Sequence, residues 1–102
     1  MSKKKGPFDT VEEKVVVRDL KIVNRFGIHA RPAALFVKTA GHFESDIIVE
    51  KEGTIVSGKS IMGLLTLEGS QGSILKITAT GSDAEEAVDA LQELVEAKFY
   101  ED

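Results

Sequence analysis

Apolar runs rich in β-branched residues alternate with polar turn segments along most of this sequence. Four runs have this character and predict strands: residues 14–23, 46–51, 54–57 and 74–79. The first run contains the charged pair Arg18–Asp19, which could make its strand irregular. The second and third runs are separated by Glu52 and Gly53, and a glycine at this point is typical of a tight hairpin turn.

Three other segments have the apolar spacing of helices: residues 32–40, 60–67 and 84–95. Pro32 suits a first helical turn, where its missing N–H group costs nothing, and Gly41 can end that helix. Before the last segment, Ser82 and Glu85 have the spacing of a capping box.

The expected order is therefore βαββαβα, which fits an α+β sandwich. We expect the three helices to cover one face of the sheet and the other face to meet solvent. Residues 1–13 are lysine-rich and nearly without apolar side chains, so we interpret them as a flexible leader. Residues 14–102 then form one domain.

Composition narrows the class of protein. A chain of 102 residues with 42% hydrophobic positions suits one small folded domain and is too short for a multi-domain enzyme. The absence of cysteine excludes disulfides, thiolate metal sites and thiol nucleophiles. A net charge of −4, no membrane-length apolar run and no signal-peptide core indicate a cytoplasmic protein that binds neither nucleic acid nor a membrane directly.

One motif points to a nucleotide site. Residues 53–60 match G-x-x-x-x-G-K-[ST], the pattern of a phosphate-binding loop. The middle of this match is Thr-Ile-Val-Ser, which is typical of a strand, whereas a phosphate cradle needs successive backbone N–H groups turned inward. We therefore reject the nucleotide-binding interpretation.

His29 is the main candidate for chemistry. It precedes the helix that contains Pro32, so its ring would lie near unpaired N–H groups, and Arg31 could add a guanidinium suited to phosphate oxygens. A nucleophilic imidazole among anion stabilisers favours phosphoryl transfer through phosphohistidine. The alternative is that His29 only flanks the helix and Arg31 is a solvated charge. His42 has no such neighbours and is interpreted as a surface residue.

No metal ion or cofactor is expected, because positioning and charge stabilisation carry most of a phosphoryl transfer.

Residues 26–34, with the sequence Phe-Gly-Ile-His-Ala-Arg-Pro-Ala-Ala, resemble the active-site segment of the HPr family. These are the histidine-containing phosphocarriers of the phosphoenolpyruvate-dependent sugar phosphotransferase system. Residues 36–38, 58–63 and 82–87 resemble the family in the same order, so the likeness covers about residues 14 to 97. It implies an HPr-like open-faced sandwich whose four antiparallel strands have the order 1-4-2-3.

The resemblance also assigns roles. It implies that His29 accepts phosphate on Nδ1 from phosphorylated Enzyme I and gives it to a sugar-specific IIA domain, while Arg31 stabilises the phosphoryl group. Such a protein is a stoichiometric carrier, not an enzyme with its own small substrate, and we expect a monomer. A regulatory paralogue of the nitrogen or carbon-control type, acting mainly by binding partners, is the alternative.

Ser60 matches the serine that an ATP-dependent HPr kinase/phosphorylase modifies in many bacteria, which links carbon status to transcription. The family likeness thus implies this kinase and a catabolite-control transcription factor as further partners. A phosphate there would add a charge of about −1.5 to −2. The alternative is that Ser60 only caps a helix.

A docking surface is expected beside these sites. Its apolar members would be Ile28, Ile61, Met62 and Leu65, and its cationic members Arg31, Lys38 and Lys59. The alternative for each apolar residue is ordinary packing in the core.

Overall fold

The computed structural model describes residues 13–101. The expected leader, residues 1–13, therefore lies outside the described residues except for Glu13, and its boundary with the domain stays a prediction. No helix within residues 13–101 has both the length and the apolar character needed to cross a membrane.

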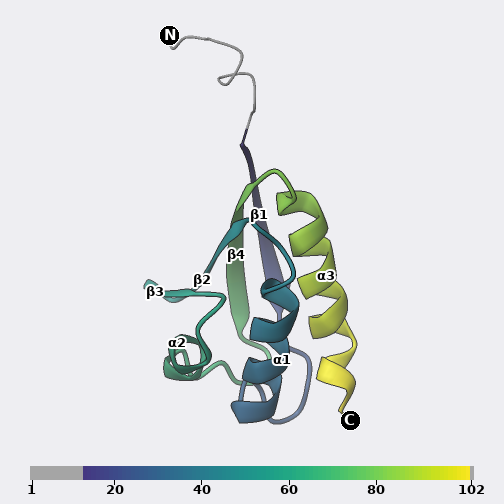
Figure 1. Cartoon of the computed structure of the whole chain (residues 1–102). Coiled ribbons are helices and arrows are strands. Elements are labelled where there is room, and N and C mark those ends of the chain that lie inside the picture. Colours follow the sequence, from purple (N-terminus) through teal and green to yellow (C-terminus); the bar gives the residue numbers. More distant parts are fainter. Residues whose placement is uncertain (1–12, 102) are drawn as a thin grey trace, which may run out of the picture.

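The chain follows the predicted order of strands and helices and adds a short 3-10 turn at its end (Figure 1). The elements are β1 (Lys14–Lys21), α1 (Ala30–Ala40), β2 (Asp46–Lys51), β3 (Thr54–Ser57), α2 (Ile61–Thr66), β4 (Ile74–Gly81), α3 (Ala84–Glu96) and η2 (Lys98–Tyr100). The sheet has the order β1-β4-β2-β3 and all its pairs are antiparallel, which confirms the open-faced sandwich.

Strand β1 is regular throughout. It pairs with β4 without a break from Lys14 opposite Gly81 to Lys21 opposite Ile74, so the irregularity considered at Arg18 does not occur. The charged Arg18 side chain is accommodated because it reaches α3.

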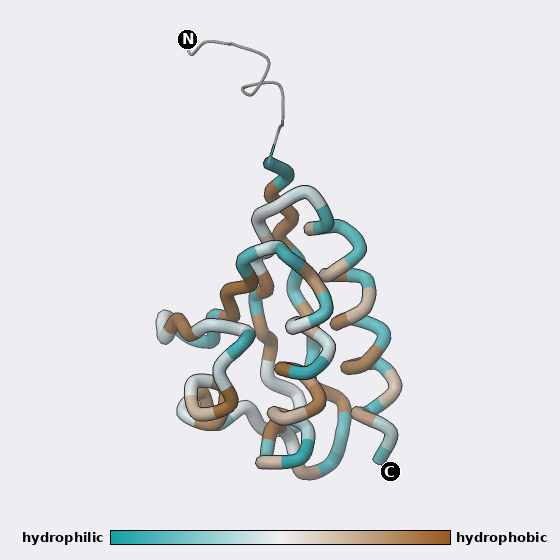
Figure 2. The backbone as a smooth tube through the Cα atoms, in the orientation of Figure 1, coloured by the Kyte–Doolittle hydropathy of each residue, from teal (hydrophilic) through white to brown (hydrophobic). Residues whose placement is uncertain are grey.

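The core lies between the sheet and the helices (Figure 2). Its largest fully buried side chains include Phe36 from α1, Leu91 from α3 and Ile77 from β4. The apolar side chains that alternate with the core positions stay exposed, as expected for an uncovered sheet face: Val15, Val17, Ile48, Ile55 and Ile74.

The predicted capping box of the last helix is wrong. Asp83, not Ser82, is the N-cap of α3, and it makes no side-chain capping bond. Its carboxylate instead accepts hydrogen bonds from the backbone N–H groups of Glu44 and Ser45, and Glu85 pairs with Arg18. The side chains of Asp83 and Glu85 thus make tertiary contacts in place of capping bonds: Asp83 ties α3 to the loop before β2, and Glu85 ties it to β1.

The hairpin between β2 and β3 turns as predicted. Glu52 and Gly53 have φ angles of 51° and 87°, the left-handed pair of a tight turn. Residues 54–57 of the nucleotide-binding motif form β3, paired with β2 along its length. This strand leaves no loop to cradle phosphates.

Candidate functional site

His29 lies at the start of α1. Figure 1 shows α1 in the lower half of the molecule. His29 is the N-cap residue, its backbone carbonyl accepts a hydrogen bond from Ala33 N–H at 3.0 Å, and its side chain is 44% exposed. The ring of Phe26 approaches it edge-on, with 6.5 Å between centroids. The helix begins at Ala30, which places Pro32 in the first turn, as predicted.

A tight loop sets the position of His29. Gly27 has φ +67°, and a Cβ at this position would lie 2.1 Å from the backbone oxygen of Gly69. The next residue, Ile28, donates its N–H to that same oxygen at 2.8 Å. Glycine fits here because a side chain would overlap the loop after α2, and the left-handed backbone adds a further, smaller cost for any other residue.

Asn24 holds this loop from inside. It is fully buried, and its Nδ2 donates to the carbonyl of Gly27 at 2.8 Å and to Oε1 of Glu101 at 3.0 Å. The N–H of Gly27 in turn donates to the backbone oxygen of Asn24 at 3.3 Å. The side chain therefore joins the loop before His29 to the end of the chain.

The start of α1 offers donors for an anion. Pro32 has no N–H group and Ala33 uses its own, whereas the N–H groups of Ala30 and Arg31 find no backbone acceptor in the part of the chain that the structure describes. The Arg31 guanidinium is exposed and makes no ion pair with any of residues 13–101. Among residues 13–101, His29 thus stands beside two backbone donors and one cation without partners, a set that is chemically suited to an anion.

Glu101 brings a carboxylate to the histidine. Its Oε1 lies 3.2 Å from His29 Nε2, although 72 residues separate the two along the chain. The hydrogen bond from Asn24 lowers the pKa of Glu101 most, the hydrogen bond and charge of His29 and the charge of Arg31 lower it further, and desolvation opposes them. The carboxylate is therefore ionised near neutral pH.

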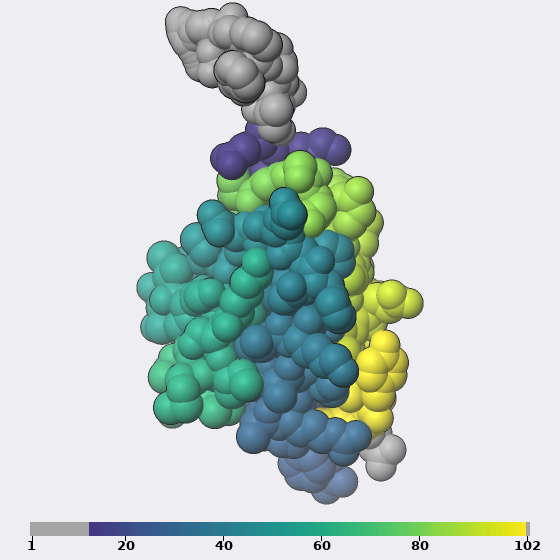
Figure 3. Space-filling model, in the orientation of Figure 1, coloured from purple at the N-terminus to yellow at the C-terminus, as the bar shows by residue number. Residues whose placement is uncertain are grey.

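The turn η2 directs Glu101 toward His29. Lys98, Phe99 and Tyr100 all have positive φ angles, between 54° and 60°, and each such non-glycine residue costs about 1–2 kcal/mol. Phe99 is fully buried and holds the turn against the core. In Figure 3 the yellow residues near the C-terminus lie against the blue segment that contains α1.

Ser60 is the N-cap of α2, and its Oγ accepts a hydrogen bond from Gly63 N–H at 2.9 Å. The capping alternative for this residue is therefore confirmed as a structural role. Its side chain is half-buried, so it remains partly accessible to solvent while it caps the helix.

The expected apolar patch is divided between surface and core. Met62 is 72% exposed and Ile61 41% exposed, and Leu65 packs partly against the core. Ile28 is only 7% exposed, so its assignment to an exposed patch is wrong. Its side chain belongs to the hydrophobic core, because burying an apolar side chain is more favourable than exposing it.

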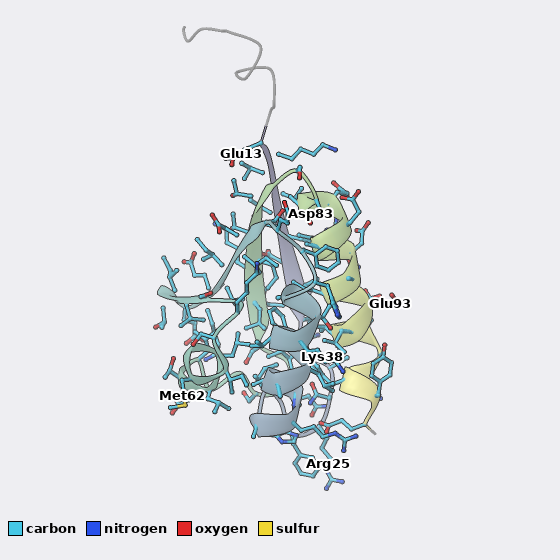
Figure 4. The ribbon with its side chains drawn as sticks, in the orientation of Figure 1. Glu13, Arg25, Lys38, Met62, Asp83 and Glu93 are labelled. Carbon is cyan, nitrogen blue, oxygen red and sulfur yellow. The ribbon has the colours of Figure 1, made fainter. Side chains whose placement is uncertain are left out.

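The expected cations lie in two places. Lys38 is in the last turn of α1, about 13 Å along the helix from His29, and Figure 4 shows it across α1 from Met62. The ammonium of Lys59 donates to the carbonyl of Phe43, beyond the same end of α1. Arg31 is thus the one predicted cation at the histidine.

Sequence reasoning missed the roles of four residues at this site: Asn24, Arg25, Phe26 and Glu101. Arg25 stacks over the exposed ring of Phe26, 5.2 Å from its centroid, and lies below the start of α1 in Figure 4. A polar Asn24 after an apolar strand was a usable signal for a loop anchor, whereas nothing in the sequence connects Glu101 to His29.

Within residues 13–101, no group of three or more His, Asp or Glu side chains could hold a metal ion. His42 is exposed just after α1 and takes no part in the site.

The chain is similar to phosphocarrier proteins over most of its length. The family model described as "PTS HPr component phosphorylation site" matches residues 16–97. Phosphocarrier protein HPr of Treponema pallidum is 39% identical over 88 residues, 86% of this chain and all of that protein. HPr-like protein Crh of Bacillus subtilis is 46% identical over 86 residues, 84% of this chain and 95% of that protein.

A solved structure shows the same fold. The crystal structure of HPr-C-His from Thermoanaerobacter tengcongensis matches with a TM-score of 0.82 and 50% sequence identity, covering 85% of this chain and 98% of that one.

Proposed function

Because this chain belongs to the HPr family, we propose that it accepts a phosphoryl group on His29 from phosphorylated Enzyme I and passes it to IIA domains of sugar permeases. The supporting observation is the half-exposed ring of His29 beside the free N–H groups of Ala30 and Arg31. The protein is then a cytoplasmic, monomeric carrier that is regenerated at each transfer.

The transfer needs little from the acceptor besides position and charge. The lone pair of His29 Nδ1 forms a bond to phosphorus while the bond from phosphorus to Enzyme I breaks. The Arg31 guanidinium and the free N–H groups at the start of α1 face the phosphoryl oxygens. The same contacts hold the group until the acceptor atom of a IIA domain bonds to phosphorus and the bond from phosphorus to His29 Nδ1 breaks.

The experiment is a phosphorylation assay with phosphoenolpyruvate, Mg²⁺ and Enzyme I. We expect an acid-labile phosphoryl group that is lost in His29→Ala and kept in His42→Ala, the matched histidine outside the site. Arg31→Ala should slow the transfer by about tenfold or more, because one oriented donor to the phosphoryl oxygens is lost. Full labelling of His29→Ala would show that the acceptor is another residue.

We further propose that Ser60 is a regulatory site for an HPr kinase/phosphorylase, and that the modified protein binds a catabolite-control transcription factor. Support comes from its half-buried hydroxyl and from the exposed side chains of Lys59, Ile61 and Met62 next to it. Kinase and ATP should give an acid-stable phosphoserine in the wild type and in Ser57→Ala, the neighbouring serine. Persistent labelling of Ser60→Ala would exclude this site.

Partner docking is proposed for the exposed residues around His29 and α2. Met62 and Phe26 are the most exposed apolar side chains of this region, at 72% and 71%. Met62→Ala should leave thermal stability within about 0.5 kcal/mol, as is usual for exposed positions, and weaken binding to Enzyme I or a IIA domain. Unchanged binding would remove Met62 from the docking surface.

A regulatory paralogue is the second candidate, favoured by the 46% identity to HPr-like protein Crh. Such a protein would bind transporters, kinases or transcription factors without supplying the phosphate for uptake. The two candidates differ in one measurement. A carrier restores sugar uptake in cells that lack their own HPr, whereas a regulator binds partners and leaves uptake unrestored.

A further inference from the structure

Glu101 touches the imidazole of His29 on one specific nitrogen. Its Oε1 lies 3.2 Å from Nε2, while Nδ1 has no hydrogen-bond partner among residues 13–101. A neutral imidazole carries a single ring proton, and the hydrogen bond made by one nitrogen decides which of the two carries it. The contact can therefore select the tautomer.

The charge of Glu101 determines the direction of this hydrogen bond. Hydrogen bonds from Asn24 and His29 and the charge of Arg31 hold the pKa of Glu101 below its usual range, so near neutral pH the carboxylate can only accept. The same Oε1 already accepts the amide hydrogen of Asn24 at 3.0 Å. The proton between Glu101 and the ring must then be carried by Nε2, which leaves the lone pair on Nδ1.

The position of Glu101 is fixed by two independent anchors. One is the buried side chain of Asn24, which also holds the Gly27 carbonyl in the loop before His29. The other is Phe99, fully buried in the left-handed turn η2 two residues before the glutamate. Residues of this type rarely adopt positive φ, and here three in a row turn the end of the chain toward the histidine.

We propose that Glu101 is a positioning residue, whose carboxylate holds the proton of His29 on Nε2 and so presents the Nδ1 lone pair to the phosphoryl donor. This inference rests on the proposed phosphocarrier function. During transfer Nδ1 bonds to phosphorus as the bond to the donor breaks, and no proton has to leave Nδ1. The product ring keeps its Nε2 proton and gains a positive charge, which the ionised carboxylate faces.

The test compares Glu101→Ala and Glu101→Gln with Glu93→Ala in the full chain. Glu93 is an exposed glutamate on α3, on the side that faces away from α1 (Figure 4). Glu93→Ala removes the same negative charge as Glu101→Ala, but away from His29. Nitrogen-15 NMR of the His29 ring reports the tautomer without any partner protein. Phosphorylation by Enzyme I then gives kcat and KM separately.

We expect Glu101→Ala to raise the population with the proton on Nδ1 and to lower kcat about three- to tenfold with KM unchanged, the range for one lost hydrogen bond. Glu101→Gln should lie between, because its amide oxygen can still accept, and Glu93→Ala should match the wild type. An unchanged tautomer, or a changed tautomer with unchanged kcat, would overturn the proposal. Failure of the wild-type chain to accept phosphate would instead refute the phosphocarrier function, while the NMR result would still report the contact.

Discussion

Replacing Gly27 by alanine tests whether the loop before His29 depends on the close approach of Gly69. The matched control is Gly53→Ala in the hairpin turn, since both glycines have positive φ, +67° and +87°. A Cβ at Gly53 would meet no atom within 4 Å, whereas one at Gly27 would lie 2.1 Å from the Gly69 oxygen. The two variants therefore share the backbone cost and differ in the steric one.

The expected magnitudes follow from these contacts. A left-handed alanine costs about 1–2 kcal/mol, which is the whole expected loss in Gly53→Ala. In Gly27→Ala the loop must also move away from Gly69, so the 2.8 Å hydrogen bond from Ile28 N–H is lost, adding about 0.5–1.5 kcal/mol. We expect a total of about 2–4 kcal/mol for Gly27→Ala once the remaining overlap is relieved.

Urea denaturation of the wild type and both variants measures these free energies of unfolding. The phosphorylation assay with Enzyme I is then run under conditions in which all three are folded. Only Gly27→Ala should be phosphorylated more slowly, because only that loop carries His29. Equal losses of stability, or equal phosphorylation rates in the two variants, would refute the conclusion that the Gly69 contact positions the histidine.

Three further substitutions test other contacts of the fold. Asn24→Ala should lower the free energy of unfolding in urea by about 1–3 kcal/mol, because the Gly27 carbonyl loses a buried donor; a smaller change would contradict its role as an anchor. Phe99→Ala should cost about 3–5 kcal/mol in the same assay, since the ring is fully buried, and a loss below about 1 kcal/mol would mean that η2 is not held by the core. The pKa of Asp83 is lowered, chiefly by the hydrogen bond from the Ser45 hydroxyl, so its contribution is fully present above the usual aspartate range and is lost as pH falls through the lowered pKa. Urea titrations should therefore show a stability gap between wild type and Asp83→Asn at neutral pH that closes in acid; a gap independent of pH would argue against it.

The strands and helices could be predicted because each buries one regular face. The alternation of Leu75, Ile77 and Ala79 toward the core in β4 is visible in the sequence, as is the helical spacing in α3. The order of the strands in the sheet could not be predicted in this way, since periodicity alone does not specify which strands are neighbours. The expected order came from the resemblance to the HPr family, and the pairing of β1 with β4 confirms that order.

The parts that could not be predicted depend on contacts between distant residues. The carboxylate of Asp83 is used by the loop before β2 and not by its own helix. Phe99 and its neighbours are ordinary residues whose local preferences do not predict a left-handed turn, and only burial of the ring accounts for it. Ile28 was misplaced because one apolar residue in a loop has no period that shows which way it faces.

The strand order also has a consequence for how the chain is made. Strand β4 lies between β1 and β2, yet about half the chain separates the end of β1 from its start. During synthesis β1 emerges first and has no partner until β4 follows, and only the β2–β3 hairpin can pair locally. The sheet must therefore assemble late and by closing a long loop, which makes folding slower than in a domain built from neighbouring strands. A chain that stops before Ile74 lacks the strand that joins β1 to the hairpin, and so cannot form the four-stranded sheet of the domain that carries His29.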